Sequence, residues 1–163
     1  MNGIDIAAGI HDRVRAGRNE KLRRRAVETL LSEHEQTVYF AYRFHLQVAG
    51  ESIESWAIQT ASGFDVQGAL IALEEIGCTV LLERARQAVH LALRDGAADF
   101  EHFEPDEEIL ADLRGVEPDV AADELQAVDR PSSQPTSWDL LASELEPALD
   151  AYVARHLASE AST

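Results

Sequence analysis

The chain has 163 residues, with 30 Asp or Glu and only 14 Lys or Arg, so its formal net charge is −16 with the histidines neutral. This charge repels nucleic acid and anionic membranes, which excludes direct nucleic-acid binding and attachment to a membrane surface. A hydrophobic share of 45% is typical of a globular domain, and no apolar run reaches the ~18–20 residues of a membrane helix. We therefore expect a soluble, cytoplasmic protein that needs no cofactor.

The acidic charge is concentrated in the second part of the chain. Residues 1–94 hold 12 acids and 11 bases, whereas residues 95–163 hold 18 acids and three bases. Within the latter, residues 95–129 carry 13 acids and a single arginine, whereas seven bases lie between Arg13 and Arg25. We therefore predict a basic N-terminal arm over residues 1–18. A single domain over 19–163 follows, with its acidic portion at 95–163.

Apolar residues in the first half of the chain recur at steps of three and four, which predicts α-helices. The first predicted helix is a long amphipathic one over residues 19–48, and a short helix follows over 52–60. Asp65 is the predicted N-cap of the next helix, and Gly77 suits a left-handed C-cap at its end. A further helix over residues 79–94 then completes a helical hairpin.

The C-terminal half gives weaker signals. Prolines precede two short predicted helices over residues 107–113 and 119–128, and residues 130–136 have the composition of a mobile linker. Ser137 is the predicted cap of a last amphipathic helix, which Pro147 should kink or divide. The pattern as a whole predicts a single compact all-α domain of about six to eight helices, centred on the long helix and the hairpin.

The sequence lacks the motifs of the common enzyme classes. It has no zinc-protease helix motif, no phosphate-binding glycine loop, no serine elbow and no dinucleotide-binding fingerprint. Cys78 follows the predicted cap glycine, and we interpret it as a small buried residue rather than a nucleophile. We interpret His34, His45 and His90 as hydrogen-bonded, half-buried histidines on or beside apolar stripes. These features predict a protein that is not an enzyme.

A metal-dependent hydrolase is the enzyme alternative. Asp99 and His102 lie among further carboxylates that could supply oxygen ligands. However, the segment lacks the ordered spacing and the turn glycine of a calcium loop. The chain also lacks the paired Glu-x-x-His units of a carboxylate-bridged di-metal bundle. We therefore predict no metal site, with His102 as a titrating surface group.

The middle of the chain resembles a bacterial family of small helical proteins that includes a known DNA mimic. The matching features are the run from Val48 to Trp56 with its glycine turn, the break at Ser62-Gly63, and the run from Ala72 to Cys78. The resemblance covers residues 33–95 well and 137–158 loosely. It implies a helical fold and, from the DNA-mimic member, a protein that occupies the DNA-binding face of a regulatory protein.

The spacing of the acids is compatible with such a role. Duplex DNA carries one charge per ~1.7 Å of its axis, and acids three or four positions apart on a helix lie ~5–6 Å from one another. Glu108 with Asp112 and Asp119 with Asp123 have this spacing. We predict that a basic partner, with a DNA-binding protein as the leading hypothesis, binds the acidic segment. The predicted partner-binding residues are Asp99, Glu101, Glu104, Asp106, Glu107, Glu108, Asp112, Glu117, Asp119, Asp123, Glu124 and Asp129.

Other interpretations remain open at this point. The acids could form a solvated face that keeps the protein in solution. The chain could instead be an interaction module of the immunity or antitoxin type, in which apolar contacts dominate and high salt weakens binding little. A homodimer is also expected, with the basic arm of one copy against the acidic region of another.

Overall fold

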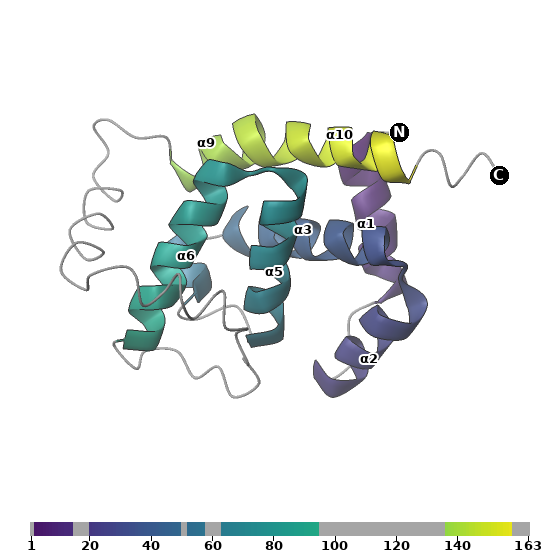
Figure 1. Ribbon diagram of the computed structural model, residues 1–163, viewed down its shortest axis with the longest axis horizontal. Helices are drawn as coiled ribbons and strands as arrows, with labels where there is room; N and C mark the ends of the chain where they lie inside the picture. Colours follow the sequence, from purple (N-terminus) through teal and green to yellow (C-terminus); the bar gives the residue numbers. More distant parts are fainter. Residues whose placement is uncertain (1, 15–19, 50–51, 58–62, 95–135, 158–163) are drawn as a thin grey trace.

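The computed structural model describes residues 2–14, 20–49, 52–57, 63–94 and 136–157, and all their regular elements are helical (Figure 1). The elements are α1 (Gly3–Arg13), α2 (Glu20–Leu30), α3 (Glu33–Ala49), α4 (Ile53–Ser55), α5 (Gly63–Ile76), α6 (Thr79–Arg94), α9 (Ser137–Leu140), the π-helical turn η2 (Leu141–Leu145) and α10 (Glu146–His156). The predicted all-α fold is therefore confirmed. None of the helices in these ranges is long and apolar enough to span a membrane.

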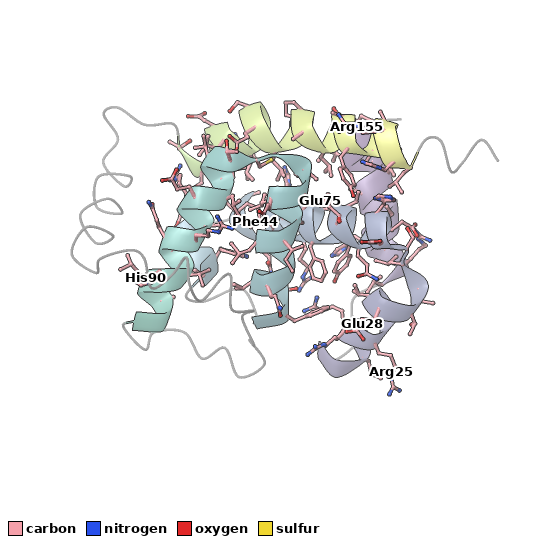
Figure 2. The ribbon with its side chains drawn as sticks, in the orientation of Figure 1. Arg25, Glu28, Phe44, Glu75, His90 and Arg155 are labelled. Carbon is pink, nitrogen blue, oxygen red and sulfur yellow. The ribbon has the colours of Figure 1, made fainter. Side chains whose placement is uncertain are left out.

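Helix α3 lies at the centre of the arrangement. The α5–α6 hairpin packs against it, and α9, η2 and α10 form a continuous helical rod along one side, with α1 between α3 and α10 (Figure 1). Phe44 of α3 points into the middle of the molecule, whereas Arg25 and Glu28 of α2 point away from it (Figure 2). Phe44 and the fully buried Trp56 meet edge to face at 4.9 Å between ring centroids. The core thus surrounds α3, whose buried residues run from Val38 to Val48.

The single long helix predicted over residues 19–48 is wrong, because the chain breaks between α2 and α3. Ser32 accepts a hydrogen bond from the Glu35 amide, and the Glu35 carboxylate accepts one from the Ser32 amide. This reciprocal capping box starts a new helix. The break changes which side chains face inward, so Leu22 and Leu30, which the predicted stripe included, are 50% and 52% exposed.

The N-terminal segment differs from the predicted basic arm over residues 1–18. Gly3–Arg13 form a helix that packs against α3 and α10, and its Ala7 and Ile10 belong to the core. A Cβ atom at Gly3 would lie 2.8 Å from the Cα atom of Asp150. Only glycine therefore permits the close contact in which the Gly3 amide donates to the Asp150 carboxylate.

The hairpin of α5 and α6 is confirmed, together with its glycine cap. Gly77 has φ +85°, in the left-handed region that favours glycine. Its amide donates to the carbonyl of Glu74, and the amide of Cys78 donates to the carbonyl of Leu73. These two bonds define a Schellman motif, which satisfies carbonyls that the end of α5 would otherwise leave unpaired.

The start of α6 is capped by a residue that is distant in the sequence. The carboxylate of Glu144 accepts hydrogen bonds from the amides of Val80 at 3.3 Å and Leu81 at 2.8 Å. The residue before α6 is Cys78, which has no side-chain oxygen to do this. A negative charge at a helix N-terminus is favourable, so Glu144 joins the rod of η2 and α10 to the hairpin.

The predicted last helix is present over residues 137–156, but its details differ from the prediction. Thr136, rather than Ser137, is the N-cap, and it forms a capping box with Asp139. The predicted disturbance near Pro147 takes the form of the π-helical turn η2, after which Pro147 lies in the first turn of α10. Pro147 has no amide hydrogen to donate, so one hydrogen bond of the rod is lost at this junction, directly after the wider π-helical turn.

Several predicted elements cannot be compared in full. Ser52 caps α4, and Trp56 and Ala57 after it are buried, but residues 58–60 of the predicted short helix lie outside the described ranges. The two short helices predicted over 107–113 and 119–128 lie outside them as well, as does all of the predicted linker except Thr136. These predictions stay predictions.

Asp65 is the centre of a buried polar network. The prediction of Asp65 as an N-cap is wrong, because α5 begins at Gly63 and Asp65 lies within its first turn, with its side chain 3% exposed. Arg23 donates from Nη1 to Asp65 Oδ1 at 2.8 Å, and Arg43 donates from Nε at 3.3 Å. Gln47 donates from Nε2 to the other carboxylate oxygen, also at 3.3 Å. One carboxylate therefore joins α2, α3 and α5.

Two further contacts extend the network. Arg23 also donates from Nη1 to the hydroxyl oxygen of Tyr39 at 2.9 Å, and the indole of Trp56 donates to Gln47 Oε1 at 3.0 Å. Burial alone lowers the pKa of Arg23, but the Asp65 carboxylate and the Tyr39 hydroxyl outweigh that effect, so the pKa is raised. The guanidinium therefore stays charged although it is almost fully enclosed.

We expect Asp65→Asn to lower the free energy of unfolding by about 3 kcal/mol, because it leaves the Arg23 charge buried without its counter-charge. Urea unfolding followed by circular dichroism measures this change. The matched control is Glu28→Gln, which breaks the exposed pair with Arg24 and should cost less than about 0.5 kcal/mol. Equal losses in the two variants would contradict a central role for Asp65.

Candidate functional site

The predicted partner-binding surface lies outside the described residues. All twelve predicted carboxylates, from Asp99 to Asp129, fall between residues 95 and 135, as does the Asp99–His102 pair of the hydrolase alternative. The structure therefore does not bring these residues together or separate them, and the surface stays a prediction from sequence. In the ranges that the structure does describe, no group of three or more His, Cys, Asp or Glu side chains could hold a metal ion.

Cys78 is buried, as predicted. Its side chain has no exposed surface, and its thiol donates a weak hydrogen bond to the backbone carbonyl of Glu144 at 3.7 Å. Burial, and secondarily the charge of Glu144, raise the pKa of the thiol to about 12. The thiolate that a nucleophile or a metal ligand requires is therefore absent at neutral pH.

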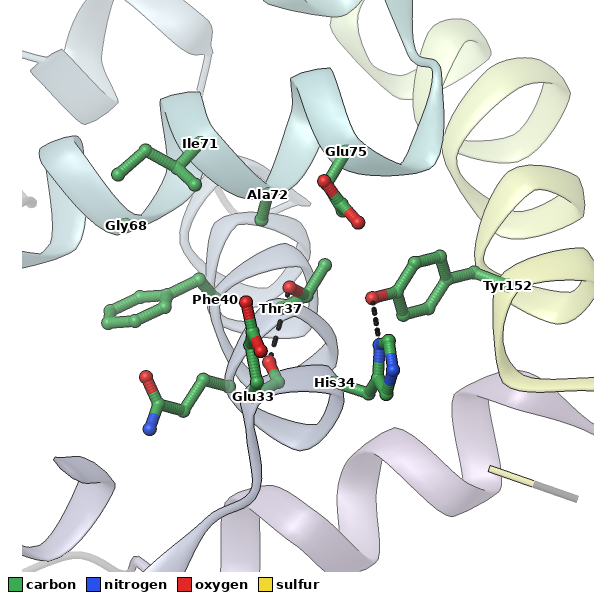
Figure 3. Close-up of a pocket in the computed structure, with 10 residues that line it drawn as sticks. Glu33, His34, Thr37, Phe40, Gly68, Ile71, Ala72, Glu75 and Tyr152 are labelled. Carbon is green, nitrogen blue, oxygen red and sulfur yellow. Dashed lines mark hydrogen bonds between the residues drawn. The ribbon is translucent and has the colours of Figure 1, made fainter. Parts of the chain in front are cut away.

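A pocket of about 260 Å³ opens between α3, α5 and α10 (Figure 3). Four of its residues lie one or two turns apart on α5, five lie on the facing side of α3, and one comes from α10. The lining consists of Glu33, His34, Gln36, Thr37, Phe40, Gly68, Ile71, Ala72, Glu75 and Tyr152. Acidic groups, hydrogen-bonding groups and apolar groups therefore meet in one small concavity.

The floor of the pocket depends on a glycine. A Cβ atom at Gly68 would lie 2.2 Å from the ring of Phe40, so any other residue would displace that ring. The ring also meets Phe64 edge to face at 5.0 Å. Gly68 is therefore a close-packing position, and Phe40 is the group that packs there. The aromatic ring and the small Ala72 form an apolar base.

A cluster of three rings forms the wall on the α10 side. His34 Nδ1 lies 2.8 Å from the hydroxyl of Tyr152, and the imidazoles of His34 and His156 stack at 4.3 Å between centroids. The prediction of a hydrogen-bonded, half-buried His34 is confirmed, and His45 likewise lies 3.4 Å from a Glu146 oxygen. In contrast, Nε2 of His90 is buried with no hydrogen-bond partner among the described residues.

Two exposed carboxylates face the pocket from opposite helices. Glu33 projects from the first turn of α3, and Glu75 projects from the last turn of α5 toward Thr37 and Tyr152 (Figure 3). Within the described part of the chain, no Lys, Arg or His lies at ion-pair distance from either carboxylate. By comparison, the neighbouring Glu74 lies 3.9 Å from Arg86.

The pKa of Tyr152 is shifted by burial and by the charged groups around the pocket. Burial raises this pKa, a hydrogen bond with Thr37 lowers it, and the charges of Glu75 and Glu33 raise it further. Tyr152 therefore stays protonated at neutral pH and does not supply an activated oxygen. The arrangement lacks a nucleophile with an adjacent base, but its acidic rim and apolar floor suit a ligand with a positive charge.

This pocket was not predicted from the sequence. The sequence predicts His34 as a half-buried histidine, and it predicts the last helix, which supplies Tyr152, only as amphipathic. Glu33 and Glu75 gave no signal, because a carboxylate on an exposed helical face is common. The one available cue was the position of Glu75, since acids at helix C-termini are electrostatically unfavourable.

We expect Cys78 to resist alkylation in the native protein because its thiol is enclosed and its pKa is about 12. Iodoacetamide at pH 8 should label less than a tenth of the chains in one hour, as measured by intact mass. The urea-unfolded chain should be labelled fully and serves as the control. Rapid labelling of the folded protein would contradict the interpretation of Cys78 as a packing residue.

We expect Glu75→Gln to raise the free energy of unfolding by about 0.3–1 kcal/mol. The substitution removes a negative charge from a helix C-terminus, where the macrodipole disfavours it. Urea unfolding at low salt measures this gain, and 0.5 M NaCl should reduce it by screening. A loss of stability would instead show that Glu75 supports the fold.

One protein-family model matches the part of the chain that holds helices α3 to α10. The family model described as DMP19-like protein matches residues 29–156, from the last turn of α2 to the end of α10. No curated protein matches the chain, and no solved structure does either. The matched family is a DNA-mimic family and not a known enzyme family. Because the match covers most of the sequence, this chain belongs to the DMP19-like protein family.

Proposed function

We propose that this protein is a non-catalytic DNA mimic that binds the DNA-binding surface of a basic protein. The observation that carries the proposal is the membership in a DNA-mimic family over residues 29–156. The charge distribution supports it, since residues 95–129 hold 13 acids and one arginine, whereas residues 1–94 are nearly neutral. A nearly neutral part over residues 1–94, followed by a concentrated negative segment, suits a protein that competes with DNA.

The energetics of such a complex follow from charge. A DNA-binding protein holds phosphates with lysine and arginine side chains and releases counterions when it does so. Carboxylates at phosphate-like separations would engage the same side chains, so the complex should weaken steeply as salt increases. The acids also repel one another in the unbound protein, and a basic partner would relieve that repulsion.

We expect the joint replacement of Glu104, Glu107, Glu108 and Asp112 by their amides to abolish capture of the partner. The full chain would be immobilised and exposed to DNA-binding proteins that had been enriched on DNA-cellulose. Duplex DNA should release the captured protein from the unaltered chain, because the two compete for one surface.

The control for this experiment removes the same charge elsewhere. Four exposed acids of the described body, Asp12, Glu28, Glu74 and Glu83, are replaced by their amides. Capture should persist in this variant. Capture that survives in the Glu104–Asp112 variant and does not respond to salt would contradict the electrostatic mechanism.

A second candidate function rests on exposed apolar side chains. Trp138 on α9 is 63% exposed, and Leu46 and Val80 are each 44% exposed. Exposed apolar side chains are the contacts that a protein-interaction module of the immunity or antitoxin type would use. The same capture experiment separates the two functions, because an apolar complex would persist in high salt and would not release with DNA. The predicted homodimer and the cytoplasmic location stay predictions.

A further inference from the structure

The pocket between α3, α5 and α10 has two carboxylates that the described residues do not pair with a cation. Glu33 and Glu75 approach it from opposite sides, and no described cation lies at ion-pair distance from either of them. Glu75 also lies in the last turn of α5, where a negative charge is unfavourable. Glu33, in the first turn of α3, is favourably placed for the helix dipole, whereas Glu75 is not. A bound cation would attract both charges and would offset the unfavourable position of Glu75.

The shape of the pocket restricts what that cation can be. Its volume of about 260 Å³ is below the range of about 300–1,000 Å³ that is usual for drug-sized ligands, so it suits one side chain. Phe40 and Ala72 form an apolar floor, and the half-exposed Ile71 lies beside them. A small hydrated metal ion would gain nothing from that floor, and the described residues contain no metal-binding cluster.

An arginine side chain matches both parts of the lining. Its methylene stem and the flat face of its guanidinium can pack on apolar and aromatic surface. Its five N–H groups can donate to carboxylates that approach from different directions. Glu33, Glu75 and the hydroxyl oxygen of Thr37 are the acceptors at the rim (Figure 3). Lysine offers a compact charge without the planar face, so it fits less well.

We propose that this pocket binds an arginine side chain of the basic partner protein, and thus anchors the complex outside the acidic segment. This inference rests on the proposed function, because it takes the partner to be a basic protein. The raised pKa of Tyr152 is consistent with the proposal, since Glu75 and Glu33 both contribute negative potential at its hydroxyl. The pocket adds shape selectivity to an interaction that is otherwise governed by charge density.

The experiment is a titration of the isotope-labelled full chain with N-acetyl-arginine amide, followed by the backbone amide resonances. Saturable shifts should concentrate at Thr37, Gly68, Ala72 and Tyr152. N-acetyl-citrulline amide has the same shape without the charge and should produce no saturable shift. N-acetyl-lysine amide should bind more weakly than the arginine compound. These comparisons use the unaltered protein and need no variant to fold.

The double variant Glu33→Gln and Glu75→Gln should weaken binding of the arginine compound about three- to ten-fold, as expected for the loss of two exposed ion pairs. The control variant Asp12→Asn and Glu83→Gln removes the same charge from exposed positions away from the pocket, and its affinity should not change. Equal binding of the citrulline compound, equal weakening in both variants, or shifts spread over the whole surface would each overturn the proposal.

The titration with the arginine compound and the capture experiment for the proposed function can fail independently of one another. If the amide variant of Glu104, Glu107, Glu108 and Asp112 loses partner capture but still binds the arginine compound, both proposals are supported. If the arginine compound does not bind while the unaltered chain captures its partner and releases it with DNA, the pocket proposal alone is overturned. If the arginine compound binds but DNA releases nothing, the DNA-mimic proposal fails, and with it the identity of the proposed occupant.

Discussion

The described fold depends on one buried carboxylate. Asp65 receives hydrogen bonds from Arg23 of α2 and from Arg43 and Gln47 of α3, and Gln47 in turn accepts one from Trp56. A buried charge is tolerated only when its partners are oriented correctly. This network therefore fixes how α2 and α3 lie relative to one another across the break at Ser32, and how α5 lies on α3. The position of α5 on α3 in turn sets the pocket, because Gly68 and Phe40 meet along the same contact.

The parts of the fold that the sequence predicted correctly are those with local causes. Gly77 ends α5 because only glycine readily takes the left-handed conformation. The identity of this single residue is therefore enough to predict the end of the helix. The inward side of the last helix followed from its period. The break between α2 and α3 also had a local signal, the Ser32-x-x-Glu35 capping box. The predicted helix nevertheless runs through this break, because apolar residues recur at steps of three and four on both sides of it. Such spacing does not show that one helix ends and another begins.

The parts that could not be predicted have their causes far apart in the sequence. Asp65 was interpreted as a cap because its partners, Arg23 and Arg43, lie 42 and 22 positions away. Glu144 caps α6 from 63 positions away, and no pattern around Thr79 indicates it. The pocket likewise required Glu33, Glu75 and Tyr152 to be brought together from three helices. For the acidic segment, the charge was evident from composition, but its arrangement in space was not.

The contact between the first and the last helix of the body bears on how the protein is made. Helix α1 packs against α10, and the Gly3 amide bonds to Asp150, which lies 147 positions later. A ribosome adds roughly 5–20 residues per second, so roughly 7–30 seconds separate the synthesis of the two partners. During that interval α1 can pack on α3 but lacks the surface of α10 that it later contacts. The contact between α1 and α10 therefore forms only after translation has reached α10.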